Sequence, residues 1–347
     1  MTYQQPPQTA ENAWYGQAGG YIVHDPAEDS LGLPSGYGQF DIPLILSSKE
    51  YKSDGTLVNP ASETDSLFGD IIEVNGQPWP YFNVQPRKYR LRFLDAAISR
   101  TFLLYFQRST GSTAKIPFQV IASDCGLLSG PATTSSLYIS MGERYEVVFD
   151  FAPFAGQNIT LRNTEDVGKD DDYLHTNKVM RFVVSGTPVP DPSTVPSSLS
   201  VVPFPTPKSN RNVDHRFEFD RSNGEWQING VTFANVNNRL LANVPRGTVE
   251  IWELENGGGG WSHPIHIHLI DFRILSRSDD EDRPVYNYES MGLKDVVWLA
   301  PNEIVRVEAH YAPWDGVYMF HCHNLIHEDV SPLRFDPTMG GFQGDDC

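Results

Sequence analysis

The chain has 347 residues, which is enough for two or three domains that each bury a core of their own. A formal net charge of −18 opposes binding to phosphate backbones, so we expect no nucleic-acid partner. No apolar run is long enough to cross a bilayer, and the opening MTYQQPPQTAENAWYG lacks the features of a secretion signal, so we expect no membrane partner and assign no compartment.

The composition favours strands over helices. The 28 glycines and 26 prolines are spread among short β-branched and aromatic runs, a distribution typical of many strands joined by turns. We therefore predict an all-β protein built from sandwich or barrel domains.

The chain divides at a proline-rich stretch. Residues 186–207 hold seven prolines, which prevent regular strand pairing and favour an extended interdomain crossing. Before it, FDIPLILSS, KYRLRFLDA, SLYIS and RYEVVFDF read as strands, and a second series follows it: HRFEFD, EWQING, TVEIWELEN, HPIHIHLIDFRIL, KDVVWLA, IVRVEAHY and GVYMFHCH. We predict these units: a domain remnant at 1–36, a domain at 37–186, a linker at 187–210 and a domain at 211–347.

The segment before the first series is expected to contain one strand. GGYIVHD, residues 19–25, has the pattern of a strand and is followed by turn residues. A lone strand needs a neighbouring sheet, so this segment is expected to be the end of a domain whose beginning lies elsewhere.

The three cysteines match neither a disulfide framework nor a zinc pattern built on CxxC pairs. Cys125, in IASDCGLL, is expected to be a small buried apolar residue. Cys347 is the last residue. Only Cys322, between two histidines, has neighbours that indicate chemistry.

Six of the ten histidines form two tight groups, HPIHIH at 263–268 and HCHNLIH at 321–327. Alternate side chains of a strand point to opposite faces. His266 and His268 are therefore expected to share one face, as are His321 and His323, while Cys322 points the other way.

This arrangement predicts two metal centres. The histidine pairs converge on one centre, while Cys322, His263 and His327 converge on the other. Two imidazoles and a thiolate are the ligand set of a blue-copper electron-transfer site. One HxH motif alone is equally well explained as a partly buried pair, and zinc uses the same ligand types, but two ligand groups that share one strand favour copper.

The two groups resemble the C-terminal copper motifs of multicopper oxidases, and nearest among them those of fungal bilirubin oxidases and laccases. The likeness extends over nearly the whole chain, through VNGQPWPYFNVQPRKYRLRFLDAAISR, QVIASDCGLL, ERYEVVFDF and GLKDVVWL. It implies tandem cupredoxin-like Greek-key domains: the remnant of a first at 1–36, a second at 37–186 and a third, copper-binding domain at 211–347. It also implies one-electron oxidation of phenolic or tetrapyrrole donors coupled to reduction of O2 to water, in pigment or secondary-metabolite biosynthesis.

Residue roles follow from the same resemblance. It assigns His263, Cys322 and His327 to a type 1 copper, and His266 to a type 2 copper. It places Trp261 beside the type 1 site against an aromatic donor, although a packing aromatic is an equal alternative. It assigns His268, His321 and His323 to the type 3 copper pair. It gives Glu328 a role in relaying protons or tuning the site, with an exposed carboxylate as the simpler interpretation.

The chain departs from the family pattern at two places. The trinuclear cluster of the family takes half of its eight histidines from two HxH motifs of the first domain, and this sequence contains neither. His24, His175, His215 and His310 are isolated and are expected to be surface or core residues. The position of the weak axial methionine is Pro332, followed by Leu333, with Met339 as a more distant substitute.

Two functions remain open at this point. One is an oxidase whose partners are a small aromatic donor and O2, with the missing histidines supplied either by a fuller gene product or by a second chain. The other is a homologue that keeps only the type 1 copper for electron transfer, or a non-catalytic remnant. In-frame HxH motifs upstream of Met1 would favour the oxidase.

Overall fold

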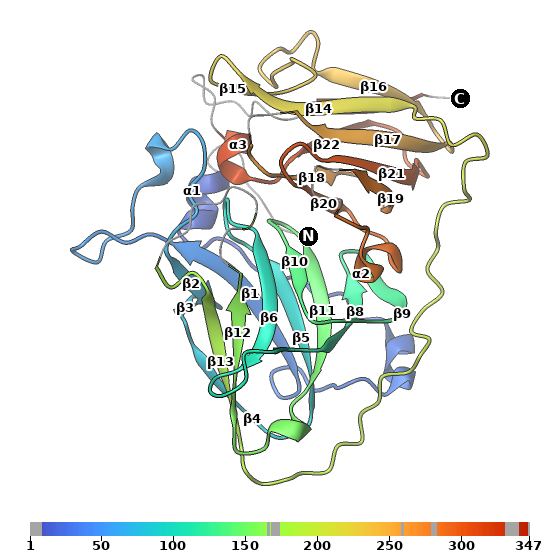
Figure 1. Ribbon diagram of the computed structural model, residues 1–347. Helices are drawn as coiled ribbons and strands as arrows, with labels where there is room; N and C mark the ends of the chain where they lie inside the picture. Colours follow the sequence, from blue (N-terminus) through green and yellow to red (C-terminus); the bar gives the residue numbers. More distant parts are fainter. Residues whose placement is uncertain are drawn as a thin grey trace.

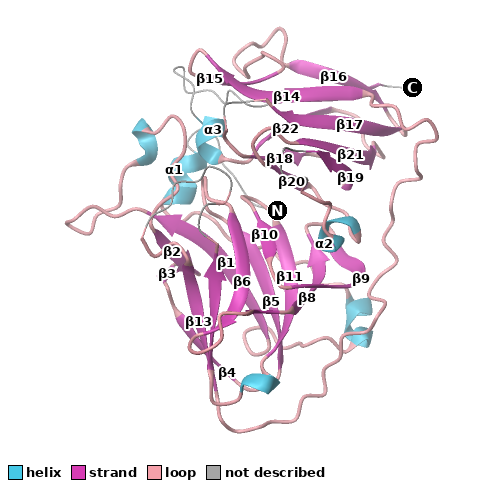
Figure 2. Cartoon of the chain, viewed as in Figure 1, coloured by secondary structure: helices cyan, strands magenta, loops and turns pink. Residues whose placement is uncertain are grey.

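Strands make up most of the ordered chain, as Figure 2 shows. The computed structural model describes residues 9–164, 167, 174–257, 260–278, 283–329 and 340–345, the last range as backbone only. The strands form four sheets, which pack in two pairs to give a first sandwich over residues 41–184 and a second over residues 215–345 (Figure 1).

Both sheets of the first sandwich have a strand order that differs from the sequence order, as in Greek-key sandwiches. One sheet runs β3 (Gln77–Pro78), β2 (Ile71–Val74), β1 (Asp41–Lys49), β5 (Lys88–Asp95), β11 (Arg144–Asp150), β8 (Phe118–Ser123), β9 (Gly126–Thr134). The other runs β10 (Leu137–Ile139), β6 (Phe102–Arg108), β12 (Asn158–Asn163), β13 (Lys178–Val184), β4 (Tyr81–Val84), with β7 (Lys115–Ile116) beside β6.

The second sandwich repeats this plan with two smaller sheets. The outer sheet runs β15 (Glu225–Ile228), β14 (His215–Ser222), β17 (Val249–Asn256), β21 (Ile304–His310), β19 (Phe272–Ser278). The sheet that faces the first sandwich runs β16 (Leu240–Pro245), β23 (Gly340–Asp345), β22 (Val317–Cys322), β18 (His263–Ile267), β20 (Val296–Leu299).

Each sandwich has its own apolar core. Inward residues alternate with outward ones along the strands, as in β14, where Phe217 and Phe219 are buried between exposed neighbours. These rings join Trp252 and Phe320 between the two sheets of the second sandwich. Phe106, Phe149 and Phe182 form the corresponding aromatic contact in the first.

The helices are short and lie at the ends of the sheets. They are α1 (Thr9–Trp14), η1 (Pro26–Leu31), η2 (Pro60–Ser62), η3 (Ala152–Phe154), α2 (Asn287–Ser290) and α3 (Leu325–Asp329). In the part of the chain that the structure describes, no helix has the length and apolar character needed to span a membrane.

The predicted all-β fold and both series of strands are confirmed, with two corrections. Residues 19–25 form no strand, because they are exposed and pair with no sheet among the described residues, whereas the helix α1 before them buries Trp14. The run HPIHIHLIDFRIL is two strands in different sheets, because Leu269 adopts a positive φ of 75° between β18 and β19.

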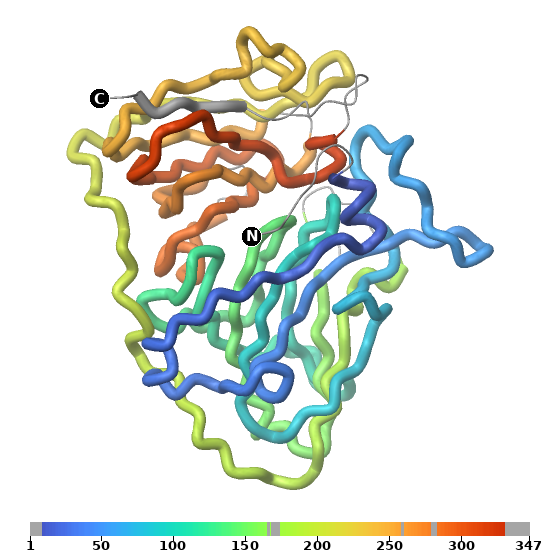
Figure 3. Tube along the Cα trace, turned by 180° about the vertical axis from the view of Figure 1, so that it is seen from behind, coloured from blue at the N-terminus to red at the C-terminus, as the bar shows by residue number. Residues whose placement is uncertain are grey.

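The segment between the sandwiches runs along the outside of both (Figures 1 and 3). It contains no strand between residues 185 and 214, all of which are described. Asp191 attaches it to the first sandwich by accepting hydrogen bonds from the Arg87 guanidinium at 3.1 Å and the Lys88 backbone N–H at 2.9 Å. The seven prolines thus prevent pairing, while one partly buried carboxylate fixes the course of the segment.

The two sandwiches meet across buried charges. The Lys294 Nζ atom, fully buried, lies 2.9 Å from Asp124 and 3.0 Å from Glu143, both in the first sandwich. Burial lowers the pKa of Lys294, but the two carboxylates outweigh burial and raise it well above its usual value. Beside it, Arg144 makes two hydrogen bonds of 2.5 and 2.7 Å to Asp295. The relative position of the sandwiches is therefore set by paired charges, of which Lys294, Asp124 and Glu143 have buried side chains.

Cys125 differs from its expected place. It lies in the turn between β8 and β9 and is only partly buried, because the turn carries it to the edge of the interface. The acidic run 169–172, most of 278–282 and Cys347 lie outside the described residues.

We predict that Lys294→Met destabilises the metal-free chain by about 3–5 kcal/mol, because Asp124 and Glu143 would remain buried without their cation. Urea unfolding at pH 7 measures this change. The control is Arg246→Met, since the exposed pair of Arg246 with Asp315 contributes at most about 1 kcal/mol. Equal losses in the two variants would contradict the proposed role of the buried charges.

Candidate metal centre

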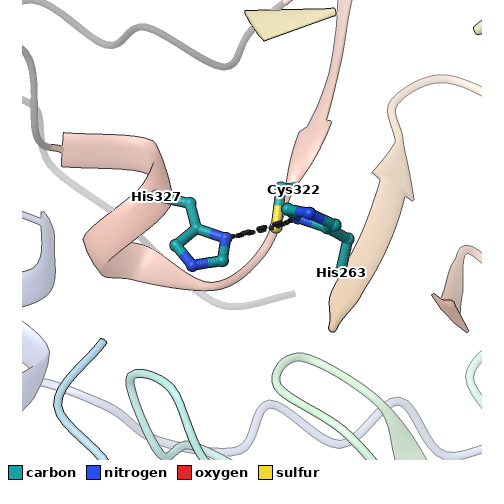
Figure 4. A group of neighbouring side chains, drawn as sticks. All are labelled: His263, Cys322 and His327. Carbon is teal, nitrogen blue, oxygen red and sulfur yellow. Dashed lines mark hydrogen bonds between the residues drawn. The ribbon is translucent and has the colours of Figure 1, made fainter. Parts of the chain in front are cut away.

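Three donor atoms from three elements meet at the end of the second sandwich's inner sheet that adjoins α3 (Figure 4). His263 begins β18, Cys322 ends β22 and His327 lies in α3. The Nδ1 atom of His263 lies 3.3 Å from the Cys322 Sγ atom and 3.3 Å from the His327 Nδ1 atom, and the third side of this triangle is 3.6 Å. A point at its centre lies about 2 Å from each donor, close to the length of a metal–nitrogen bond.

Strand register explains how these side chains converge. In the antiparallel pair of β18 and β22, Ile265 is opposite Cys322 and His266 is opposite His321. Because side chains alternate, Cys322 faces the apolar core together with Ile265, while His266 and His321 face the first sandwich. The prediction that Cys322 points to the face opposite the neighbouring histidines is confirmed.

Asn324 connects the thiol to the helix that follows. Its backbone N–H donates to the Cys322 Sγ atom at 3.4 Å, and its side-chain amide lies 3.1 Å from the His327 Nε2 atom. The Ser99 hydroxyl of the first sandwich donates to the Asn324 side-chain oxygen Oδ1 at 3.0 Å. Asn324 stands inside HCHNLIH, so its position in the motif was available as a signal, but sequence reasoning gave it no role.

Trp226 is a second contact that sequence reasoning missed. Its ring stacks on the His327 imidazole, with centroids 3.6 Å apart and planes inclined by 24°. Its indole N–H donates to the Thr64 carbonyl of the first sandwich at 3.2 Å. In the sequence Trp226 is one aromatic residue in the strand run EWQING, which gives no sign of this contact.

Burial keeps the imidazoles of the three-donor group neutral. His263, Cys322 and His327 are at most 2% exposed. Burial lowers the pKa of His263 to about 3 and that of His327 well below its usual value. A neutral imidazole offers a free lone pair at ordinary pH, so no proton competes with a metal ion for these two nitrogens.

A second group lies on the opposite face of the same strands. The ligand atoms of His266, His268 and His321 lie within 4.8 Å of one another, and the Nε2 atoms of His268 and His321 are 3.4 Å apart. The Asp295 backbone oxygen lies 2.8 Å from His266 Nδ1, which leaves Nε2 to face the group. This is the outer contact that fixes the orientation of metal-binding histidines in proteins.

His323 completes this face at the boundary with the first sandwich. Its ring centroid lies 5.7 Å from that of His321, and its buried Nδ1 atom has no hydrogen-bond partner. Gly142, at a φ of 82° in the turn before β11, leaves the room for this ring, because a Cβ there would lie 2.8 Å from it. Burial, followed by the effect of His266, lowers the pKa of His323 to about 3.

The two remaining predicted residues lie beside these groups. Trp261 is partly exposed, and its ring meets that of His327 edge to face at a centroid distance of 6.1 Å. Glu328 is 3% exposed, with Oε2 3.7 Å from the His321 Nδ1 atom. The interpretation of Glu328 as an exposed carboxylate is therefore wrong, because the helix α3 turns its side chain inward.

The other histidines take no part in either group within the described residues. His24, His175 and His310 are exposed, and His215 is half-buried beside Glu250. The predicted axial positions Pro332, Leu333 and Met339 lie outside the described residues.

The donor set fits copper. A soft thiolate and two neutral imidazoles in a triangle of this size are the strong ligands of a blue-copper site, and water is excluded from all three.

Comparison with known proteins gives the same result. Residues 205–331 match the family model described as multicopper oxidase. The chain is 62% identical to a bilirubin oxidase of Albifimbria verrucaria, and the match covers 92% of this chain and 57% of that protein. It is 30% identical to a laccase of Bacillus subtilis, and this match covers 94% of this chain and 67% of the laccase. Its fold is similar to that of the McoA multicopper oxidase of Aquifex aeolicus, with a TM-score of 0.85 and 29% sequence identity. The two structures superpose over 98% of this chain and 74% of the McoA chain.

The fold and the donor set define a copper protein built from cupredoxin-like sandwiches. The chain belongs to the multicopper oxidase family. It spans little more than half of the length of the bilirubin oxidase that it matches.

The lowered pKa values predict a pH dependence of folding. The imidazoles of His263 and His323 stay neutral in the folded chain down to about pH 3, whereas in the unfolded chain they bind protons below about pH 6.5. The metal-free chain should therefore be most stable above pH 6.5 and lose up to about 1.4 kcal/mol per pH unit for each of them as the pH falls.

Urea unfolding between pH 7 and 5 measures this slope, and His263→Leu is the comparison. The variant should show a shallower slope, because one proton-binding group is removed from its unfolded state. An equal slope in both proteins would show that the pKa of His263 is the same in the folded and the unfolded chain and would contradict the effect of burial.

Proposed function

We propose that His263, Cys322 and His327 hold a type 1 copper. The observation that supports this assignment is the triangle of two Nδ1 atoms and one Sγ atom, with sides of 3.3, 3.3 and 3.6 Å. Copper bound there supplies reversible one-electron redox chemistry. The chain's own residues fix the donors, exclude water and keep both imidazoles unprotonated.

In this proposal the histidines that face the first sandwich hold part of an oxygen-reducing copper cluster. His266 serves a type 2 copper, and His268, His321 and His323 serve a type 3 pair. The short distance between the Nε2 atoms of His268 and His321, 3.4 Å, and the unpartnered Nδ1 atom of His323 support a metal at this face. The rest of the ligands would come from a partner.

Cys322 would connect the two centres. Its side chain belongs to the first group, and its peptide bonds lead directly to His321 and His323 in the second. An electron accepted at the thiolate side thus has a covalent path along β22 to the other face. Among the described ligands, Cys322 is the one residue of its group with ligands of the other group as direct neighbours in the sequence.

The overall reaction would be one-electron oxidation of phenolic or tetrapyrrole donors coupled to reduction of O2 to water, in pigment or secondary-metabolite synthesis. Four donor oxidations balance one O2, which takes four electrons and four protons to give two waters. The similarity to a protein named bilirubin oxidase and to a laccase supports this class of donor. Trp261, partly exposed against His327, is the proposed donor contact, and Glu328, beside His321, the proposed proton carrier.

The proposed domains follow the two sandwiches. Residues 37–186 and 211–347 would be the second and third cupredoxin domains, with 187–210 as linker and 1–36 as the remnant of a first. Residues 15–27 are exposed throughout, and Tyr21 and Val23 are 75% and 81% exposed. Such an apolar run supports the proposed association with a chain that supplies the remaining cluster histidines.

The alternative is an electron-transfer protein that keeps only the type 1 copper. The histidines that face the first sandwich favour this alternative. His266, His268, His321 and His323 provide four imidazoles, whereas the family builds its cluster from eight. A remnant without copper is the last alternative. The copper content of the chain distinguishes all three.

The test is copper content per reconstituted chain, with optical and spin-resonance spectra and O2 uptake with a phenolic donor on the same sample. The chain alone should bind about one copper with an intense thiolate band. In the presence of a partner that supplies HxH motifs, it should reach about four coppers and consume O2.

The control variant is Cys322→Ser, which should lose the thiolate band while the sandwiches stay folded. A band that persists in this variant would contradict the assignment of Cys322. One copper with no O2 uptake under every condition would leave the electron-transfer alternative, and no copper at all would contradict both.

A further inference from the structure

The short helix α3, which contains His327, packs on the N-terminal helix α1, and α1 lies beside the first sandwich (Figure 1). Leu325 and Ile326 of α3 pack on Trp14, which is fully buried. The complete cluster comprises Ala10, Ala13, Trp14, Leu67, Ile98, Leu325 and Ile326. This contact joins segments more than 300 residues apart in the sequence.

Polar contacts fix the same pair of helices. The Asp329 carboxylate, at the end of α3, accepts hydrogen bonds from the backbone N–H groups of Thr9 and Ala10 and from the Thr9 hydroxyl. These bonds hold the start of α1 against the end of α3. Asp329 is two residues beyond His327, so this contact limits how far the imidazole can move.

The other end of α1 is anchored to the first sandwich. The Lys49 ammonium group, 6% exposed, donates to the carbonyl oxygens of Ala13, at 3.2 Å, and Trp14. The Trp14 indole N–H donates to the Val58 carbonyl at 2.7 Å. A buried lysine that satisfies helix carbonyls is costly to remove, so α1 is held at both ends.

The other contacts of α3 act on His327 itself, where Trp226 stacks on the imidazole, or at the start of the helix, and among those described none but α1 holds its end. Its first residue, Leu325, donates its backbone N–H to the Ile98 carbonyl at 2.8 Å, and Asn324 accepts from Ser99. Both contacts act at the start of α3. At its end, Asp329 binds α1.

We propose that α1 is a positioning element for His327, with Asp329 and Lys49 as positioning residues. Asp329 transmits the placement of α1 to the last turn of α3, and Lys49 fixes α1 on the first sandwich. This inference rests on the proposed copper site. Coupling of this kind is reciprocal: if docked α1 favours copper binding, bound copper must favour docked α1.

Hydrogen exchange tests this reciprocity without an activity assay. The full chain is compared metal-free and with one equivalent of copper, in samples whose thiolate band has been recorded. Backbone amides of residues 10–17 should exchange at least about threefold more slowly with copper, because opening of α1 would also displace His327. Amides of β12, which has no part in either group, should exchange at the same rate in both samples.

Two variants act from opposite ends of α1. Asp329→Ala and Lys49→Met should each abolish the copper-dependent protection of residues 10–17, weaken copper binding about tenfold and shift the thiolate band. Lys49 lies in β1 and does not belong to α3. A shifted thiolate band in Lys49→Met would therefore come from displacement of α1 and not from direct disturbance of α3. The matched control is Asp191→Ala, which removes a carboxylate that likewise accepts backbone N–H groups but holds the linker, and which should leave the band unchanged.

The outcomes separate the two proposals. A thiolate band in the unsubstituted chain with no change in exchange at α1 would overturn the positioning role and leave the copper site intact. Variants that bind copper as tightly as the unsubstituted chain, with the same band, would also overturn it. Absence of the band in the unsubstituted chain would overturn the proposed copper site and this inference together.

Discussion

The alternation of side chains along one strand is the constraint on which both histidine groups depend. In β22 and the residue after it, His321 and His323 point to the first sandwich, whereas Cys322 between them points into the apolar core. One strand therefore delivers ligands to two faces. A shift of register by one residue would exchange the faces, place the thiol at the interface and bury two imidazoles in the core.

The interface between the sandwiches gives the second group its surroundings. Arg144 and Lys294 pair with Asp295, Asp124 and Glu143, and these ion pairs fix the backbone that holds His266. Gly142 in the same turn leaves space for His323. The first sandwich thus contributes no metal ligand among the described residues, yet it sets the position of ligands that the second sandwich supplies.

Local pattern predicted the strands, the linker and the convergence of His263, Cys322 and His327, because these features follow from side-chain period, proline content and spacing. It failed where the structure depends on packing between distant segments. Trp226 on His327, Ser99 on Asn324 and the helix α1 beside α3 each join parts of the chain that only the folded structure brings together. Glu328 was misplaced for the same reason, since its burial depends on how α3 docks.

X-ray absorption at the copper edge of a chain loaded with one copper tests the central claim most directly. The account predicts one sulfur and two imidazole nitrogens as the strong ligands, because Cys322, His263 and His327 are the donors that lie within reach of one point. A spectrum with nitrogen scatterers alone would place the copper on the opposite face, among His266, His268 and His321, and would contradict the assignment of the thiolate centre.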